Sequence, residues 1–67
     1  MKVYIVKPTQ CEMLGIFTSK KRAIARGLEF MQENGYENVT IDERKLFIDI
    51  ESEDTYEMVE IEAHYTK

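Results

Sequence analysis

The sequence predicts a two-layer α+β domain, in which one helix packs on one face of a four-stranded antiparallel sheet in the order β-β-α-β-β. Three observations carry this prediction. The chain has 67 residues, enough for one domain with one core. Apolar residues alternate with a period of two toward both ends of the chain, and the period changes to that of a helix between them. Residues 1–67 are therefore predicted to form a single domain.

A β-hairpin is predicted at the start of the chain. Residues 2–7 and residues 12–17 are both rich in β-branched and aromatic side chains, which favour strands. Residues 8–11 between them begin with Pro8, which closes the first strand. The spacing predicts two antiparallel strands joined by a four-residue loop.

A helix of about four turns is predicted next. Its apolar residues recur at steps of three or four, which places them on one face. These residues are Ala23, Ile24, Gly27, Leu28 and Met31. Thr18 or Ser19 is expected to cap the helix start. Asn34 and Gly35 are expected to end it, with Tyr36 folding back on the last turn.

Two long strands are predicted in the second half of the chain, where the period of two returns. The alternating apolar residues are Val39, Ile41, Leu46, Ile48, Ile50, Val59, Ile61 and Ala63. The inward positions change from odd to even between Ile41 and Leu46, so residues 42–45 are expected to hold a bulge or a bend within one strand. Residues 51–54 are expected to turn the chain into the last strand.

One helix covers one face of a sheet, so the residues on the other face bear on function. We expect one apolar set to face the helix: Val3, Ile5, Leu46, Ile48, Ile50, Val59 and Ile61. A second set, Tyr4, Val6, Phe47 and Met58, then points away from the helix beside Asp49, Glu60 and Glu62. Apolar residues rimmed by carboxylates are typical of a partner-binding or homodimer face. Scattered cross-strand pairs on a solvated face are the alternative.

The charge of the chain is divided along the sequence. Residues 1–33 carry six Lys/Arg against three Asp/Glu, whereas residues 34–67 carry three against ten, and the net charge is −4. Such an asymmetry points to charged partners or to pairing of the protein with itself. A net negative chain with one small basic cluster does not favour direct binding of nucleic acid.

The basic residues of the predicted helix lie where its macrodipole disfavours them. Lys20, Lys21 and Arg22 occupy the first turn, near the positive end of the dipole. Acidic residues from the second half could lie against this turn. Alternatively, these cations could bind a phosphate-bearing ligand together with the hydroxyls of Thr18 and Ser19 and the free helix amides.

The acidic residues of the second half crowd the predicted last hairpin. They are Asp49, Glu51, Glu53, Asp54, Glu57, Glu60 and Glu62. Alternate residues of a strand lie about 6.6 to 7 Å apart, which is close to the phosphate spacing along one nucleic-acid strand. A row of carboxylates with this spacing could imitate nucleic acid and bind a basic groove of a protein. A soluble surface that protects an edge strand from aggregation is the alternative.

Catalysis is not predicted. Cys11 and His64 are the single cysteine and the single histidine, and nothing in their spacing brings them together as a nucleophile and its base or as a metal site. We expect no catalytic residues, no metal and no cofactor. One cysteine excludes an internal disulfide and favours a reducing compartment. The first apolar run, residues 3–6, is too short for a signal peptide or a membrane span, so we expect a cytoplasmic protein that does not bind membranes.

Three short segments resemble a family of very small phage and bacterial proteins of unknown function. The segments are residues 3–6, residues 14–23 with the pattern Gly-x-Phe-Thr-Ser at the helix start, and Gly35-Tyr36 at the helix end. The resemblance covers residues 1–45 and departs from the family at Lys20 and Lys21, where its members often place acidic residues. It implies a phage-type accessory protein, and many such proteins act by binding and inhibiting a host protein. Together with the acidic hairpin and the Tyr4/Phe47 face, this leads us to expect a non-enzymatic protein in the host cytoplasm that inhibits a host defence or nucleic-acid-processing protein.

Overall fold

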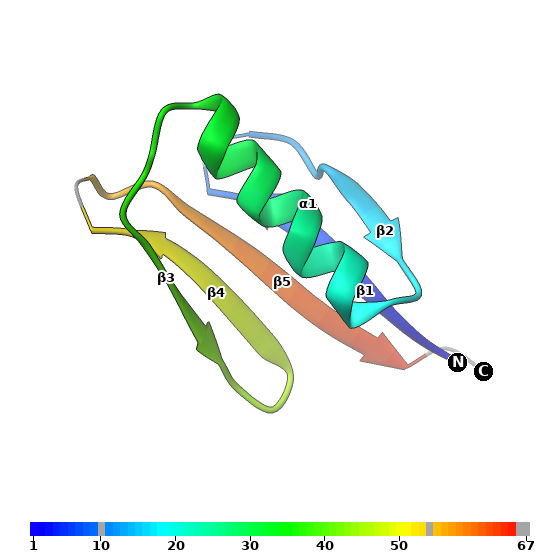
Figure 1. Cartoon of the computed structure of the whole chain (residues 1–67). Coiled ribbons are helices and arrows are strands. Elements are labelled where there is room, and N and C mark those ends of the chain that lie inside the picture. The colour runs from blue at the N-terminus through cyan, green and yellow to red at the C-terminus, as the bar shows by residue number, and fades with distance from the viewer. Residues whose placement is uncertain (10, 54, 66–67) are drawn as a thin grey trace.

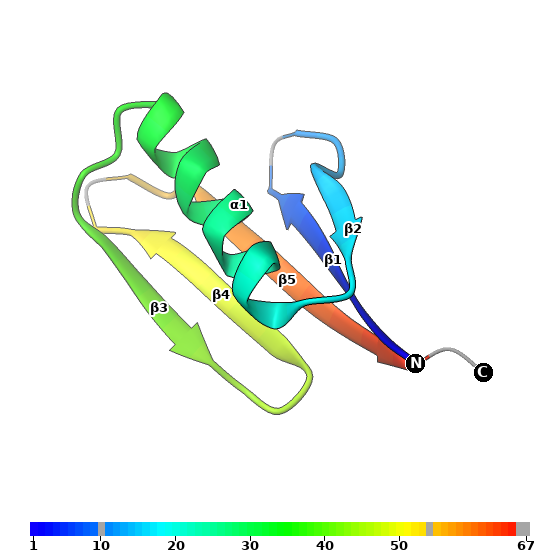
Figure 2. The ribbon, with the colours of Figure 1, turned by 45° about the vertical axis from the view of Figure 1, so that its right-hand side comes forward.

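The chain folds into two layers, a single sheet and a helix that lies across one of its faces (Figures 1 and 2). The computed structural model describes residues 1–9, 11–53 and 55–65. Its elements are β1 (Lys2–Pro8), β2 (Gly15–Phe17), α1 (Lys20–Glu33), β3 (Val39–Glu43), β4 (Phe47–Ser52) and β5 (Met58–Tyr65). The strands are ordered β2-β1-β5-β4-β3, and each neighbouring pair is antiparallel. The α+β class is as predicted.

The prediction of four strands is wrong, because the sheet has five. Residues 42–45 hold no bulge. The chain reverses there, and the Arg44 N–H donates to the Phe47 carbonyl at 2.7 Å, so that β3 and β4 form a hairpin with Ile41 opposite Ile50. This hairpin explains why the inward-facing positions change from odd to even numbers, because odd-numbered residues of β3 pair with even-numbered residues of β4.

The predicted facing of β1 is also wrong. Tyr4 and Val6 lie on the helix side and are buried, 9% and 0% exposed, whereas Val3 and Ile5 lie on the opposite side. The register decides this, because Val6 pairs with Ile61 of β5, whose side chain packs in the core. Strand β1 is apolar on both faces, so alternation alone could not choose between them.

The helix begins and ends as the sequence predicts. The Ser19 side chain accepts a hydrogen bond from the Arg22 N–H at 3.4 Å. At the other end Gly35 has a φ of 81°, which suits glycine. The Gly35 N–H donates to the Gln32 carbonyl and the Tyr36 N–H to the Met31 carbonyl, both at 3.0 Å. These two bonds form a Schellman motif.

The core lies between α1 and the strands β1, β4 and β5. Its fully buried side chains include Val6, Met31, Ile50, Val59 and Ile61. The helix lies close to the sheet at Gly27, where an added Cβ would lie 2.7 Å from Ile50 Cδ1. Because the helix packs on one side, the other face of the sheet is left uncovered by any described helix.

Candidate functional site

The candidate site is the face of the sheet that lies opposite α1, which we call the open face. The strand registers place alternate residues of all five strands on it. Its members are Val3, Ile5, Lys7, Ile16, Thr40, Asp42, Phe47, Asp49, Glu51, Met58, Glu60, Glu62 and His64. It combines apolar side chains with carboxylates, as predicted for the far side of the sheet, although its membership differs from the prediction.

Three apolar side chains of the open face, Phe47, Ile5 and Ile16, lie in one row across the sheet, and Glu62 lies between Phe47 and Ile5. Phe47 lies opposite Glu62, Glu62 opposite Ile5, and Ile5 opposite Ile16, with Val3 next to Ile5 along the face of β1. Phe47 is 42% exposed and Ile16 is 57% exposed. Apolar groups held rigidly by a sheet and exposed to solvent are suited to burial by a partner.

Carboxylates form a second row beside the apolar one. Asp42 lies opposite Asp49, Asp49 opposite Glu60, and Glu60 opposite Lys7. Three acidic side chains on neighbouring strands therefore face one another, and Lys7 is the cation at the end of the row. Like charges directly opposite each other destabilise a sheet. Asp49, at the centre of the row, is only 8% exposed, which limits the screening of its charge by water.

Glu60 and Glu62 shift each other's pKa in opposite directions in this environment. Partial burial, the hydrogen bond with Glu62 and the charges of Glu62 and Asp49 all raise the pKa of Glu60. Hydrogen bonds from His64 and then from Glu60 lower the pKa of Glu62. The His64 Nε2 lies 3.0 Å from Glu62 Oε2. Crowding of negative charge on the open face therefore makes Glu60 easier to protonate than an isolated glutamate.

The structure brings together some of the acidic residues expected on the last hairpin. Asp49, Glu51, Glu60 and Glu62 share the open face. Glu53 lies beyond β4, and its N–H donates to the Asn38 carbonyl at 2.8 Å.

Two further acidic residues of that prediction do not join the open face. The half-buried Glu57 precedes β5, and its Oε1 is buried without a hydrogen-bond partner among the described residues. Asp54 lies outside the described residues. The sequence reasoning missed Asp42, because it placed this residue in a bulge. It also missed Ile16, because it assigned no residue of the predicted strand over residues 12–17 to either face, and that strand spans only Gly15–Phe17 in the structure. It assigned Tyr4 and Val6 to the open face in place of Val3 and Ile5.

The basic helix start is partly neutralised within the fold. Lys20 forms an ion pair with Glu43 at the end of β3, as the first of the two interpretations expected. The hydroxyl of Ser19 is used for capping, while Thr18, Lys21 and Arg22 are exposed.

A small cavity lies next to the helix start. Four cations line it together with apolar residues: Lys2, Lys20, Arg44 and Lys45. Its volume is about 30 Å³, which is room for about one water molecule. It is therefore too small for a phosphate group.

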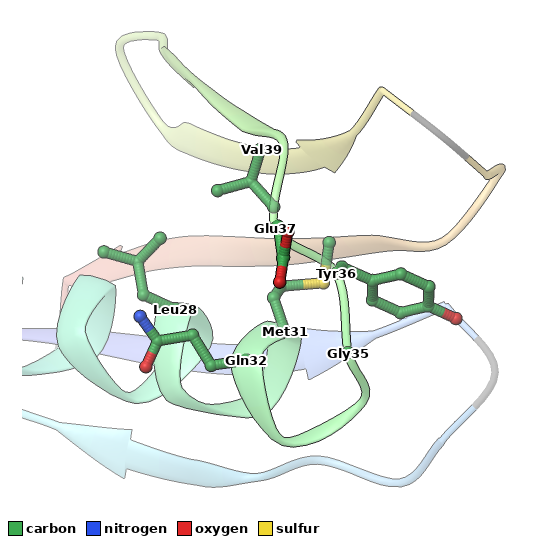
Figure 3. A pocket seen from close by; sticks show the side chains of 7 residues that line it. All are labelled: Leu28, Met31, Gln32, Gly35, Tyr36, Glu37 and Val39. Carbon is green, nitrogen blue, oxygen red and sulfur yellow. The ribbon is translucent and has the colours of Figure 1, made fainter.

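A larger pocket of about 350 Å³ opens at the other end of α1, between the last turns of the helix and the segment that leads into β3 (Figure 3). Seven residues line it: Leu28, Met31, Gln32, Gly35, Tyr36, Glu37 and Val39. Its volume is within the range of small-molecule sites. The Glu37 carboxylate and the negative end of the helix dipole make it unsuited to an anion.

Cys11 and His64 lie at opposite ends of β1. Cys11 is exposed in the loop that follows β1, whereas His64 pairs with Val3 at the start of that strand. They cannot act as a nucleophile and its base in this fold. Among the described residues, no group of three or more His, Cys, Asp or Glu side chains is arranged to hold a metal ion.

The comparisons with known proteins identify no family and no relative for this chain. No family model, no curated protein and no solved structure matches it. The resemblance to small phage proteins therefore stays a prediction. Within residues 1–9, 11–53 and 55–65, no helix combines the length and the apolar character needed to cross a membrane.

Proposed function

We propose that this protein is a non-enzymatic binding protein whose open face binds a basic surface of a partner protein. The observation that carries the proposal is the row formed by Asp42, Asp49 and Glu60, three carboxylates opposite one another on a face that no described helix covers. A row of like charges costs stability in the free protein. Local rules of stability are most often broken where function requires it.

A basic partner would relieve this cost. Lys or Arg side chains placed over the row would pair with Asp49 and Glu60, and the charge repulsion would become an attraction. The apolar row beside it, with Phe47, Ile5 and Ile16, would supply the area that a charged patch alone does not provide. Charge would then steer association and select the partner, while apolar contact would hold the complex.

The nature of the partner is a narrower proposal. The resemblance to small phage proteins suggests a host protein, and an acidic surface suggests an inhibitor of a defence or nucleic-acid-processing protein. Regular carboxylates on the open face would occupy a groove that normally binds nucleic acid. A phosphate-bearing ligand at the helix start is less favoured, because Lys20 is paired with Glu43 and the adjacent cavity holds about 30 Å³.

Paired charge variants test the proposal. The open-face variant combines Asp49→Asn with Glu60→Gln. The control combines Glu29→Gln with Glu33→Gln, two exposed residues of α1 near Arg26, and removes the same amount of charge. The wild type and both variants are used to capture proteins from the natural host, and affinity for the captured protein is then measured at low and high salt.

We expect the open-face variant to lose the captured protein and the control to retain it. Each charge-assisted contact to a carboxylate contributes about 1.5–3 kcal/mol, so loss of two should weaken binding by at least about 100-fold. Equal retention by both variants would show that the open face does not bind the partner. Replacement of Phe47 by Ser should weaken binding with little change in its salt dependence.

A further inference from the structure

Strand β3 forms an edge of the sheet, so one side of its backbone pairs with no other described strand. The Arg44 N–H bonds to Phe47, so even-numbered residues of β3 direct their backbone groups toward β4. Val39, Ile41 and Glu43 direct theirs outward, away from the sheet. The opposite edge, β2, has only three residues. Short edges resist pairing, whereas β3 has neither a proline nor a bulge to prevent it.

The two ends of β3 carry opposite charge. Glu37 precedes the strand and Lys45 follows it. If a second copy of the chain pairs with β3 in antiparallel orientation about Ile41, then Val39 lies opposite Glu43 of the second copy, and Glu37, which precedes the strand, comes close to the turn of the second copy that holds Lys45. The two-fold symmetry repeats this approach, so one register offers two ion pairs. Ile41, 46% exposed in one copy, meets its own counterpart at the centre.

Neighbouring registers are less favourable. In a two-fold antiparallel pair, residues opposite each other must face the same side of the sheet, so the two-fold axis must pass through a residue and not between two residues. The neighbouring registers are therefore centred on Thr40 and on Asp42. Pairing about Thr40 would place Glu37 opposite Glu43, and pairing about Asp42 would place that residue opposite itself. In the register about Ile41, Asp42 lies opposite Thr40, and its own charge is offset by Arg44 at 3.1 Å.

The charge of the whole molecule is polarised in the same direction. The molecule is 39 Å long, and the start of α1 lies at the same end as the turn between β3 and β4 (Figures 1 and 2). The cations Lys20, Lys21, Arg22, Arg44 and Lys45 lie there, and they outnumber the two carboxylates of that end, Asp42 and Glu43, which pair with Arg44 and Lys20. The end of α1 and the loop after β4 lie at the other end with Glu33, Glu37 and Glu53. An antiparallel pair of molecules places each basic end beside an acidic end.

We propose that two copies of this chain associate through β3 into a two-fold dimer with one continuous ten-stranded sheet. The two-fold axis of antiparallel strands is perpendicular to the sheet. Both helices therefore lie on one side, and both open faces join on the other into one surface twice as large. Pairing through a five-residue edge buries less than the roughly 1,600 Å² of a standard interface, so the dimer is a weak one that forms with increasing concentration.

Sedimentation equilibrium over a concentration series tests this dimer. Ile41→Pro is the first variant, because the Ile41 N–H points outward and its loss removes no bond within one copy. We expect association to weaken at least about tenfold, with circular dichroism unchanged. The charge variants Glu37→Lys and Lys45→Glu serve if Ile41→Pro perturbs the strand. Each single reversal should weaken association about two- to thirtyfold, the range for two exposed ion pairs, and the double reversal should restore it.

A cysteine substitution reports the register. In the Cys11→Ser background, Ile41→Cys should form a disulfide-linked dimer under mild oxidation, since residues of a hydrogen-bonded antiparallel pair have Cα atoms about 5.5 Å apart. Glu43→Cys should not, because it lies opposite Val39. A chain that stays monomeric up to about 1 mM, a dimer that tolerates Ile41→Pro together with both charge reversals, or a double reversal that fails to restore association would each overturn the proposal.

Discussion

Asp49→Asn should stabilise this protein, contrary to the usual effect of changing a nearly buried residue. Asp49 lies opposite Asp42 on one side and Glu60 on the other, and each opposed like-charge pair costs about 0.2–1 kcal/mol. The two pairs together set a range of about 0.4–2 kcal/mol. The lower half is expected, because Arg44 offsets part of the Asp42 charge at 3.1 Å. For a domain of this size, that gain raises the melting temperature by roughly 2–10 °C.

Thermal unfolding followed by circular dichroism measures this gain. The experiment compares the wild type, Asp49→Asn and the control Glu12→Gln, in which an exposed residue between β1 and β2 loses the same charge. At about 1 M salt the Debye length falls to ~3 Å, so the difference between Asp49→Asn and wild type should shrink. A lower melting temperature for Asp49→Asn at low salt would refute the reasoning, because it would mean that the fold stabilises this carboxylate. The variant that gains stability is expected to lose partner affinity, a trade-off typical of binding sites.

The remaining predictions concern pH and the helix termini. Folding raises the pKa of Glu60, so just above the usual carboxyl pKa the folded protein keeps a proton that the unfolded chain has released. Glu60 therefore contributes stability at low pH, and this contribution is lost as pH rises through its folded pKa. Glu60→Gln should remove that decrease in melts at successive pH values, whereas Glu62→Gln should remove a contribution of opposite sign, present above the ordinary pKa and lost as pH falls. Ser19→Ala should cost about 0.5–2 kcal/mol in urea unfolding, and equal loss from Thr18→Ala would contradict the assignment of the cap. Gly35→Ala should cost about 1–2 kcal/mol, since its φ of 81° is left-handed.

The helix and the strand-forming segments could be predicted from the sequence because their signals are local. A cap bonds to residues two or three positions away, and the Schellman motif at Gly35 and Tyr36 involves one turn of helix. Alternation of apolar residues likewise identified the segments that became β4 and β5. None of these features requires knowledge of a distant part of the chain.

The candidate site could be predicted only in part. The sequence indicated a mixed apolar and acidic face opposite the helix, and it named Phe47, Met58, Asp49, Glu60 and Glu62 correctly as members. It could not orient β1, because that strand is apolar on both faces and lies between two others. Its two lysines give no consistent signal, because Lys7 lies on the open face whereas Lys2 lies on the same face as Tyr4 and Val6.

Sequence alone determined the class of fold, the limits of the helix and the excess of negative charge in the second half of the chain. Tertiary structure decided which face of β1 is buried, that Asp42 and Asp49 lie on separate strands, and that the charges are divided between the two ends of the molecule. The physical reason is that cross-strand neighbours are set by register, and register depends on which strands pair. Repulsion between Asp42, Asp49 and Glu60 exists only after β3, β4 and β5 have come together.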